Sequence, residues 1–134
     1  MHLSTAYYRS HYYLYLQSSH WKNLKQKYIY SDSRACCWIC GKTSTLIIHH
    51  VNYENLGYEK TCYRFLVSLR GDIVVLCFDC HTAVHWLTIV GPIRVRVPMK
   101  KYYLVKRMKW LRLKHVLRNG GLWASVLALI DCLL

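Results

Sequence analysis

The sequence predicts a small α+β fold, in which a compact core lies between an N-terminal helix and a basic helical C-terminal extension. Helical periodicity on both sides of the core and short β-branched runs within it indicate the mixed class. Two Cys-x-x-Cys pairs within the core have the spacing of a zinc site. Bound metal often stabilises domains too small to depend on a hydrophobic core alone. The core is therefore predicted to be zinc-stabilised.

Length and composition exclude some classes of protein and indicate the charge of the partner. The chain has 134 residues, of which 54% are hydrophobic, so it is neither a large multidomain enzyme nor a disordered basic tail. It carries 19 Lys and Arg residues against 6 Asp and Glu residues, a formal net charge of +13. Such an excess favours a polyanionic partner, either nucleic acid or an anionic membrane.

Residues 1–33 are predicted to form an aromatic and basic N-terminal extension. The segment 18–30 has helical spacing, with Trp21, Leu24 and Tyr28 on one face and Ser19 as the expected N-cap. The first residues lack the basic and apolar regions of a secretory signal peptide. We therefore expect the protein to be intracellular, in a reducing compartment such as the cytoplasm or an organelle, and not secreted.

Residues 34–90 are predicted to form the core. A strand is expected at 46–51, because this run is apolar and rich in β-branched residues, and the apolar run 73–76 fits a short strand or a turn. A loop is expected from 52 to 59, whereas 61–69 fits either a short helix or a strand. A helix is expected over 77–89.

Four cysteines in this core are predicted to bind structural Zn²⁺. The pairs are Cys37 with Cys40 and Cys77 with Cys80, and Gly41 allows the tight turn of a zinc knuckle. Cys36 lacks the required spacing to Cys40, and the other cysteines are expected to be small buried hydrophobes. A redox role for a Cys-x-x-Cys pair is the alternative reading.

Residues 91–134 are predicted to form a basic extension. An extended segment or an edge strand at 91–99 precedes an amphipathic helix over 100–118, and no acidic residue occurs between Asp79 and Asp131. We expect the cations of this helix to contact nucleic-acid phosphates: Lys101, Lys106, Arg107, Lys109, Arg112 and Lys114. The apolar segment 122–134 is too short to span a bilayer and is expected to be a buried or interfacial helix.

Four histidines in the core suggest a second metal site. His49 and His50 end a predicted strand, while His81 and His85 are spaced to share one helix face. Three histidine ligands leave coordination positions open, which is typical of catalytic metal sites. His81 fits a structural zinc site as well, as a replacement for a cysteine.

The order of these cysteines and histidines resembles the HNH endonuclease family with a four-cysteine zinc core. The resemblance covers about residues 34–87 and rests on the two cysteine pairs, the His-His pair and the Cys-His-x-x-x-His string. It implies a ββα-metal fold and metal-dependent hydrolysis of DNA phosphodiester bonds, with His50 as general base. It also implies that His49, His81 and His85 bind a catalytic Mg²⁺, Mn²⁺ or Zn²⁺, and that such an enzyme belongs to a mobile element, phage or organelle. Asp72 occupies the family's central Asn position.

Two other functions remain open from the sequence. A zinc-stabilised nucleic-acid-binding module without catalysis shares the cysteines and the charge, but it does not explain the four histidines. Association of residues 100–134 with a membrane surface is less favoured than DNA binding. No small-molecule cofactor is expected, and the sequence leaves the oligomeric state open.

Overall fold

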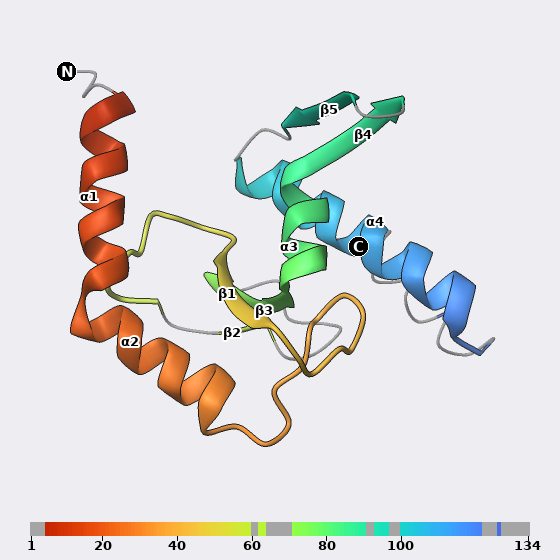
Figure 1. Cartoon of the computed structure of the whole chain (residues 1–134), viewed down its shortest axis with the longest axis horizontal. Helices are drawn as coiled ribbons and strands as arrows, with labels where there is room; N and C mark the ends of the chain where they lie inside the picture. Colours follow the sequence, from red (N-terminus) through yellow and green to blue (C-terminus); the bar gives the residue numbers. More distant parts are fainter. Residues whose placement is uncertain are drawn as a thin grey trace.

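The computed structural model describes residues 5–59, 62–63, 71–90, 93–96, 100–121 and 126, with the backbone alone at 5–10, 62–63, 88–90 and 101. Helices and strands are mixed along the chain, so the predicted α+β class is confirmed (Figure 1). The elements in chain order are α1 (Thr5–Gln17), α2 (Ser19–Lys25), the π-helix η1 (Gln26–Tyr30), β1 (Leu46–His50), β2 (Cys62–Tyr63), β3 (Ile73–Cys77), α3 (Phe78–His85), β4 (Trp86–Val90), β5 (Ile93–Arg96) and α4 (Lys101–Asn119).

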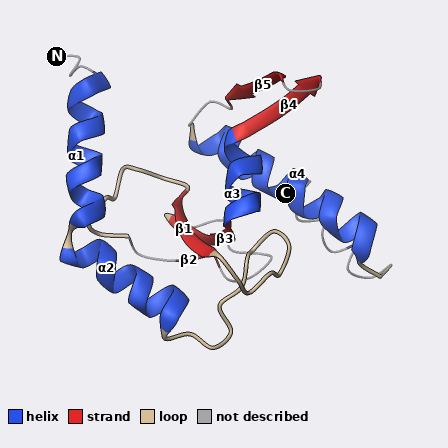
Figure 2. Cartoon of the chain, in the orientation of Figure 1, coloured by secondary structure: helices blue, strands red, loops and turns tan. Residues whose placement is uncertain are grey.

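A strand pair followed directly by a helix forms the centre of the molecule. β1 and β3 are antiparallel, with Ile48 opposite Val75, and β2 lies parallel to β3 on its other side. The order β1-β3-β2 makes β1 an edge strand, whereas every residue of β3 is buried. β3 continues without a loop into α3, which packs against β1 (Figure 2). This junction brings the second cysteine pair and the helix histidines next to β1.

The two extensions pack onto this centre in separate apolar clusters. Leu104 and Met108 of α4 share one cluster with Leu76, Val84 and the knuckle cysteine Cys37. Trp21 and Leu24 of α2 form the other cluster with Ile48 and Ile73. The division of the chain at 33/34 and 90/91 stays a prediction, but both flanking helices contribute buried side chains to the centre.

The predicted helix over 77–89 is wrong in its second half. α3 ends at His85, and Trp86–Val90 forms β4, which pairs with β5 as an antiparallel ribbon. Thr88, Ile89 and Val90 are β-branched residues, which favour strands over helices. Pairing with β5 satisfies the backbone of this segment, and that contact between distant residues overrides the helical periodicity.

The N-terminal helices differ in detail from the prediction. The hydroxyl of Ser18, not Ser19, caps α2 and accepts a hydrogen bond from the Trp21 amide at 3.2 Å. The chain then continues from α2 into η1, which confirms a helical segment ending at Tyr30. α1 precedes it as an additional helix and places Tyr12 and Tyr15 near the end of β1 (Figure 1).

The C-terminal helix agrees with the prediction as far as the structure describes it. α4 runs to Asn119, and Gly120 follows it as the C-cap. The expected apolar helix over 122–134 lies outside the described residues except for Val126, as does most of the uncertain segment 61–69. In the described part of the chain, each helix is too short or too polar to cross a bilayer.

Candidate metal centres

The first cysteine pair lies in a tight turn. The Gly41 amide donates to the Cys37 carbonyl, and the Cys37 amide donates to the Lys42 carbonyl, both at 2.8 Å. Gly41 adopts φ 74°, a left-handed conformation that favours glycine. The Trp38 amide donates to the Val75 carbonyl of β3 at 2.9 Å and anchors the turn to the sheet. The predicted knuckle geometry is thereby confirmed.

The second cysteine pair lies at the junction of β3 and α3. Cys77 is the last residue of β3 and the N-cap of α3, and its sulfur accepts from the Cys80 amide at 3.5 Å. The Sγ atoms of Cys37, Cys40, Cys77 and Cys80 lie within 4.8 Å of one another. Cys40 and Cys77 sulfurs are 3.7 Å apart, close to the roughly 3.8 Å edge of a tetrahedron with zinc–sulfur bonds of about 2.3 Å.

The cysteine chemistry fits zinc better than a disulfide. A sulfur separation of 3.7 Å is far longer than an S–S bond of about 2.05 Å, and all four cysteines are free. Cys36 is exposed, whereas Cys37 is buried and lies in the cluster with Cys40, Cys77 and Cys80. The four cysteines form one closed set of thiol ligands, the composition of a structural zinc site.

The protonation of the cluster also favours a bound cation. A hydrogen bond from the Cys80 thiol lowers the pKa of Cys37 to about 4, whereas the same contact and burial raise the pKa of Cys80. Without metal, the cluster therefore contains protonated thiols. These thiols must lose their protons before all four sulfurs can bind zinc as thiolates. Zinc binding here should release protons and be favoured by higher pH.

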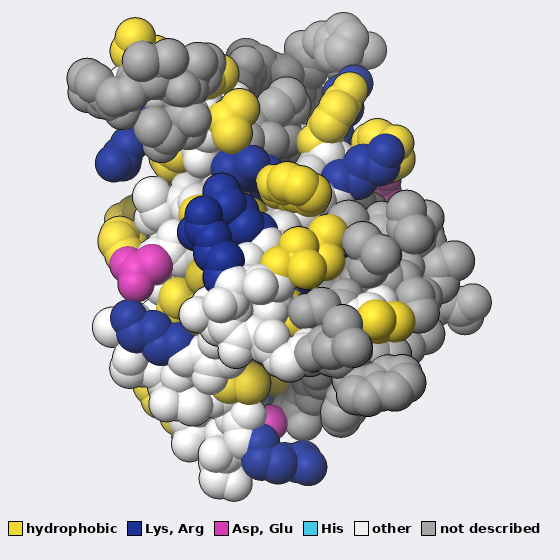
Figure 3. Space-filling model, turned by 90° about the vertical axis from the view of Figure 1, so that its right-hand side faces the viewer, with side chains coloured by type: hydrophobic (Ala, Val, Ile, Leu, Met, Phe, Trp, Pro, Cys, Tyr) yellow, Lys and Arg dark blue, Asp and Glu magenta, His cyan; other side chains and the backbone are white. Residues whose placement is uncertain are grey.

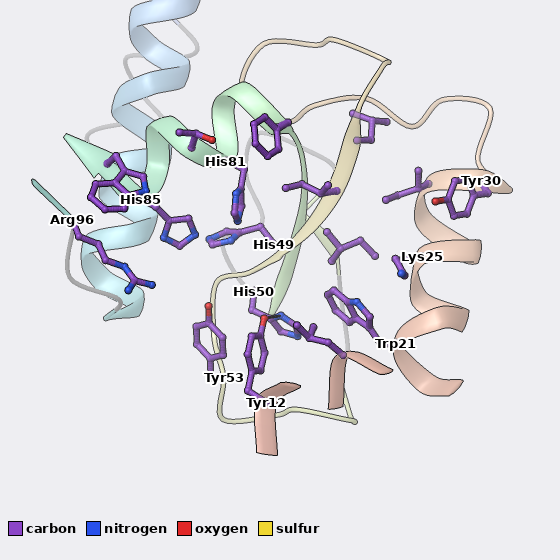
Figure 4. Close-up of a pocket in the computed structure, with 18 residues that line it drawn as sticks. Tyr12, Trp21, Lys25, Tyr30, His49, His50, Tyr53, His81, His85 and Arg96 are labelled. Carbon is purple, nitrogen blue, oxygen red and sulfur yellow. Dashed lines mark hydrogen bonds between the residues drawn. The ribbon is translucent and has the colours of Figure 1, made fainter. Parts of the chain in front are cut away.

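Three histidines form a second cluster beside the first. His49 projects from β1 toward α3, where His81 and His85 project back from the helix (Figure 4). Their ring centroids lie 5.1, 4.8 and 4.6 Å apart for the pairs 49–81, 49–85 and 81–85. Each histidine offers one nitrogen within 4.8 Å of the others. The structure thus brings together the three predicted ligands.

Two nitrogens in this cluster are buried without a hydrogen-bond partner. They are Nε2 of His49 and Nδ1 of His85. Buried polar atoms in folded proteins are almost always paired, so two unpaired nitrogens within a cluster of three histidines fit ligands of an ion. Burial and the neighbouring imidazoles lower the pKa of His49 to about 2 and that of His85 to about 4. At neutral pH both rings are uncharged, the form that binds metal.

This histidine burial predicts a pH-dependent stability. Both pKa values lie below the 6.5 of an ordinary histidine, so the unfolded chain binds more protons between about pH 6.5 and 4. With zinc on the cysteines and no second ion, the free energy of unfolding should fall as the pH decreases through that window. Urea titrations at pH 7.5, 6.5 and 5.5 measure the slope.

The matched comparison is His49→Asn against His115→Asn. The His49→Asn variant should show a flatter pH slope than wild type, because one buried base has been removed. His115 lies on α4 and is not a member of the histidine cluster, so its replacement should leave the slope unchanged. Equal slopes in wild type and His49→Asn would show that burial of His49 does not govern the pH dependence.

His50 faces the opposite side of β1. Its Nε2 lies 3.0 Å from Oε1 of Glu59, and its Nδ1 lies 3.1 Å from the Tyr12 hydroxyl. Its ring stacks between Trp21 and Tyr53, with centroid distances of 4.7 and 5.4 Å. Alternation along a strand separates His49 from His50 in this way. His50 is therefore held rigidly by contacts that the sequence pattern did not reveal.

Glu59 organises the surroundings of His50. Its carboxylate is fully buried and accepts hydrogen bonds from His50, the Tyr15 hydroxyl and His20, the last at 2.6 Å. Burial alone would raise its pKa, but these donors outweigh burial and lower the pKa to about 2. Glu59 is thus an anion that accepts from Nε2 of His50 and leaves Nδ1 as the basic nitrogen. Burial lowers the pKa of His50, so the ring is neutral at pH 7.

Asp72 fixes the loop after β1. Its carboxylate accepts from Asn52 at 3.1 Å and from Asn55 at 3.1 and 3.3 Å. Its backbone carbonyl accepts from the amides of Val51 and Asn52. The carboxylate at the central Asn position of the family therefore accepts hydrogen bonds from two amide side chains of the loop. The same loop continues to Glu59.

A groove of about 900 Å³ runs along the free edge of β1, with α2 and η1 on one side and α3 on the other. The histidine cluster opens into this groove, and His50, Tyr12 and Tyr53 line it further along (Figure 4). Arg96 of β5 also lines it and is close enough to His85 to lower the pKa of that residue further. Sequence reasoning did not identify Arg96, because its approach depends on the β4–β5 ribbon.

The cations predicted to contact DNA have different environments. Lys106 and Lys114 are exposed, and their contact with phosphates stays a prediction. Arg107 donates to the Ala83 carbonyl at 3.3 Å, the Arg112 guanidinium lies 4.5 Å above the Trp38 ring, and Lys109 is buried. Arg107 and Arg112 thereby help to attach α4 to the centre. The Lys101 side chain lies outside the described residues.

The described geometry therefore unites the predicted ligands in two clusters, with four cysteines in one and three histidines in the other. His50 follows His49 on β1 and faces the opposite side of the strand. Asp72 forms hydrogen bonds with the loop that follows β1. Comparisons with protein-family models, with curated proteins and with solved structures return no match. The chemistry of the site is accordingly inferred from its own residues.

Proposed function

We propose that the protein is a metal-dependent endonuclease of the HNH, ββα-metal type. The observation that carries this proposal is the histidine cluster, which has two buried nitrogens without a hydrogen-bond partner and whose three residues line an open groove. Three neutral imidazoles leave coordination positions for substrate and water, whereas the closed cysteine cluster suits a structural zinc. The strand pair β1–β3 and the helix α3 supply the corresponding ββα scaffold.

The chain's own groups fit phosphodiester hydrolysis. A bound divalent ion would neutralise charge developing on the phosphoryl and leaving oxygens. Nδ1 of His50 accepts a proton at neutral pH, and Glu59 holds the ring and stabilises its charged form. The Tyr12 hydroxyl lies 3.1 Å from Nδ1, and Tyr12 also lines the groove, so this hydroxyl can pass a proton from water to His50.

Arg96 supplies positive charge on the same groove. It is the described cation that lines both the groove and the neighbouring surface of the β4–β5 ribbon. A guanidinium is always charged and donates two parallel hydrogen bonds to phosphate oxygens. We assign to Arg96 the binding of a phosphate next to the histidine cluster.

Cleavage of supercoiled plasmid tests the proposal. The wild-type chain, loaded with zinc at the cysteines, should convert supercoiled DNA to nicked or linear DNA when Mg²⁺ or Mn²⁺ is added. A His85→Ala variant removes one of three ligands and should need much more metal for half-maximal cleavage. His115→Ala is the control with a histidine outside the groove, and it should behave as wild type.

Two outcomes would contradict this function. One is the absence of cleavage by a folded wild-type chain across both metals. The other is a His85→Ala variant with an unchanged metal requirement, which would place the chemistry elsewhere.

A zinc-stabilised nucleic-acid-binding module is the second candidate. It is favoured by one observation, namely that both ring nitrogens of His50 already have partners within the protein. Such a module would bind DNA without cutting it and would not need a second ion. Native mass spectrometry separates the two functions, because the nuclease should bind two metal ions per chain and the module one.

A further inference from the structure

A second groove lies between the β4–β5 ribbon and α4. One cavity of about 450 Å³ and an adjoining one of about 390 Å³ share Leu87, Arg107 and Trp110 in their walls. We call this feature the ribbon groove and define it by Trp86, Leu87, Arg94, Arg107, Trp110 and Lys114. In Figure 1 the ribbon stands beyond the end of α3, with α4 passing beneath it.

The walls of the ribbon groove combine cations with exposed aromatic rings. Trp86 is 42% exposed and Trp110 is 52% exposed, although large aromatic side chains are usually buried. Arg94, Arg107 and Lys114 line the same cavity, and its described walls contain no carboxylate. Figure 3 shows this side of the molecule, where Lys and Arg side chains alternate with hydrophobic ones.

Exposed aromatic rings beside cations fit a ligand that has both a flat apolar part and an anionic part. An unpaired nucleotide has both parts, because its base stacks on aromatic rings and its phosphate binds Arg or Lys. The bases of an intact duplex are stacked inside the helix and cannot reach tryptophans in a concave wall. A flat membrane surface would likewise not enter a cavity. We propose that the ribbon groove binds a single-stranded segment of nucleic acid.

The ribbon groove connects with the groove at the histidine cluster. Thr82 and Trp86 line both the metal-site groove and the first cavity, and Arg96 lines the metal-site groove and the second cavity. A strand held on Trp86 and Trp110 therefore lies next to the phosphate that Arg96 would bind. This connection with cleavage rests on the proposed function and assigns to it a substrate with an unpaired segment beside the scissile bond.

The fixed position of Arg107 supports the same assignment. Its guanidinium donates to the Ala83 carbonyl through Nε and one terminal nitrogen, at 3.4 and 3.3 Å. The side chain is therefore held at the shared wall of the two cavities, with further N–H groups available for a phosphate. A cation that is already ordered loses less conformational entropy when it binds.

Fluorescence anisotropy with labelled oligonucleotides tests the ribbon groove. A labelled 12-mer of deoxythymidine, the same length of duplex, and phosphatidylserine vesicles are offered to the full chain. The chain carries zinc and the His81→Ala substitution, so that cleavage does not interfere with binding. We expect the single strand to bind more tightly than the duplex, and the vesicles not to compete.

Substitutions within the groove should weaken binding of the single strand. Loss of one base–aromatic stack in Trp110→Ala should raise the dissociation constant roughly tenfold or more. Arg94→Ala should raise it and reduce its salt dependence. Tyr58→Ala and Arg34→Ala are matched controls, because both side chains are exposed and line neither groove, and these should bind as the parent does. Circular dichroism confirms that each variant is folded.

The outcomes separate this proposal from the nuclease. Three results would each refute single-strand binding by the ribbon groove: tighter binding of the duplex, competition by vesicles, or unchanged binding by Trp110→Ala. Single-strand binding that depends on Trp110, in a chain that never cleaves DNA, would support the groove and refute the nuclease. Cleavage by wild type with a Trp110→Ala variant that binds normally would refute the groove alone.

Discussion

Cys37→Ser should prevent the chain from folding. This substitution removes one of four sulfur ligands from a cluster that belongs to the main apolar core, where Cys37 is 1% exposed. Structural zinc sites contribute on the order of 10–16 kcal/mol in zinc-finger peptides, more than the total stability of a typical small domain. We expect the variant to lose zinc and cooperative thermal unfolding, as measured by elemental analysis and circular dichroism.

Cys36→Ser provides the matched control at the neighbouring position. Its thiol is exposed and is not a member of the four-sulfur cluster. This variant should bind one structural zinc and unfold at the wild-type temperature. If Cys37→Ser also retained zinc and cooperative unfolding, the cysteine cluster would not be the stabilising centre of the fold.

His50→Gln should lower the cleavage rate by about 10²- to 10⁴-fold, the range for loss of a general base. A glutamine side chain is polar and can form hydrogen bonds with Glu59 and Tyr12, but it cannot accept a proton at neutral pH. The histidine cluster lies on the other face of β1, so metal binding should be unchanged. Rates from plasmid cleavage and metal counts from native mass spectrometry measure the two effects.

Glu59→Gln separates a catalytic role of His50 from a structural one. The carboxylate raises the pKa of His50 against the effect of burial, so its removal should lower that pKa further. We expect a slower plateau rate and an acidic limb of the pH–rate profile that moves to lower pH. A uniform loss of rate with an unmoved pH profile, or wild-type rates in His50→Gln, would refute the assignment of His50 as base.

The ligand clusters could be predicted because their spacing is local. Cys37 with Cys40, and His81 with His85, are close in sequence, and a turn or a helix brings each pair together without tertiary information. His49 was identified by its position at the end of a β-branched run. The predicted ligand residues lie together even though the end of α3 at His85 was not predicted.

The groups that modify the histidines could not be found in this way. Glu59 reaches His50 through a turning loop, and His20 and Tyr15 reach Glu59 from the N-terminal helices. Arg96 reaches the groove only because β4 and β5 pair. Each contact depends on packing between distant segments, for which a single sequence carries no periodic pattern. The same limit explains why the sequence did not show that Arg107 bonds to the Ala83 carbonyl of α3 or that Lys109 is buried.

The position of Cys77 predicts that the cysteine cluster should bind its metal before the histidine cluster does. It ends β3, caps α3 and supplies a sulfur to the first cluster, while His81 and His85 lie along the same short helix. A helix of eight residues is marginal without tertiary support, so α3 should be frayed until zinc holds its first turn. Zinc binding at the cysteines would then be required before the histidines of α3 can take up their positions. Cellular zinc supply, rather than the concentration of the second ion, would set how many chains can become competent.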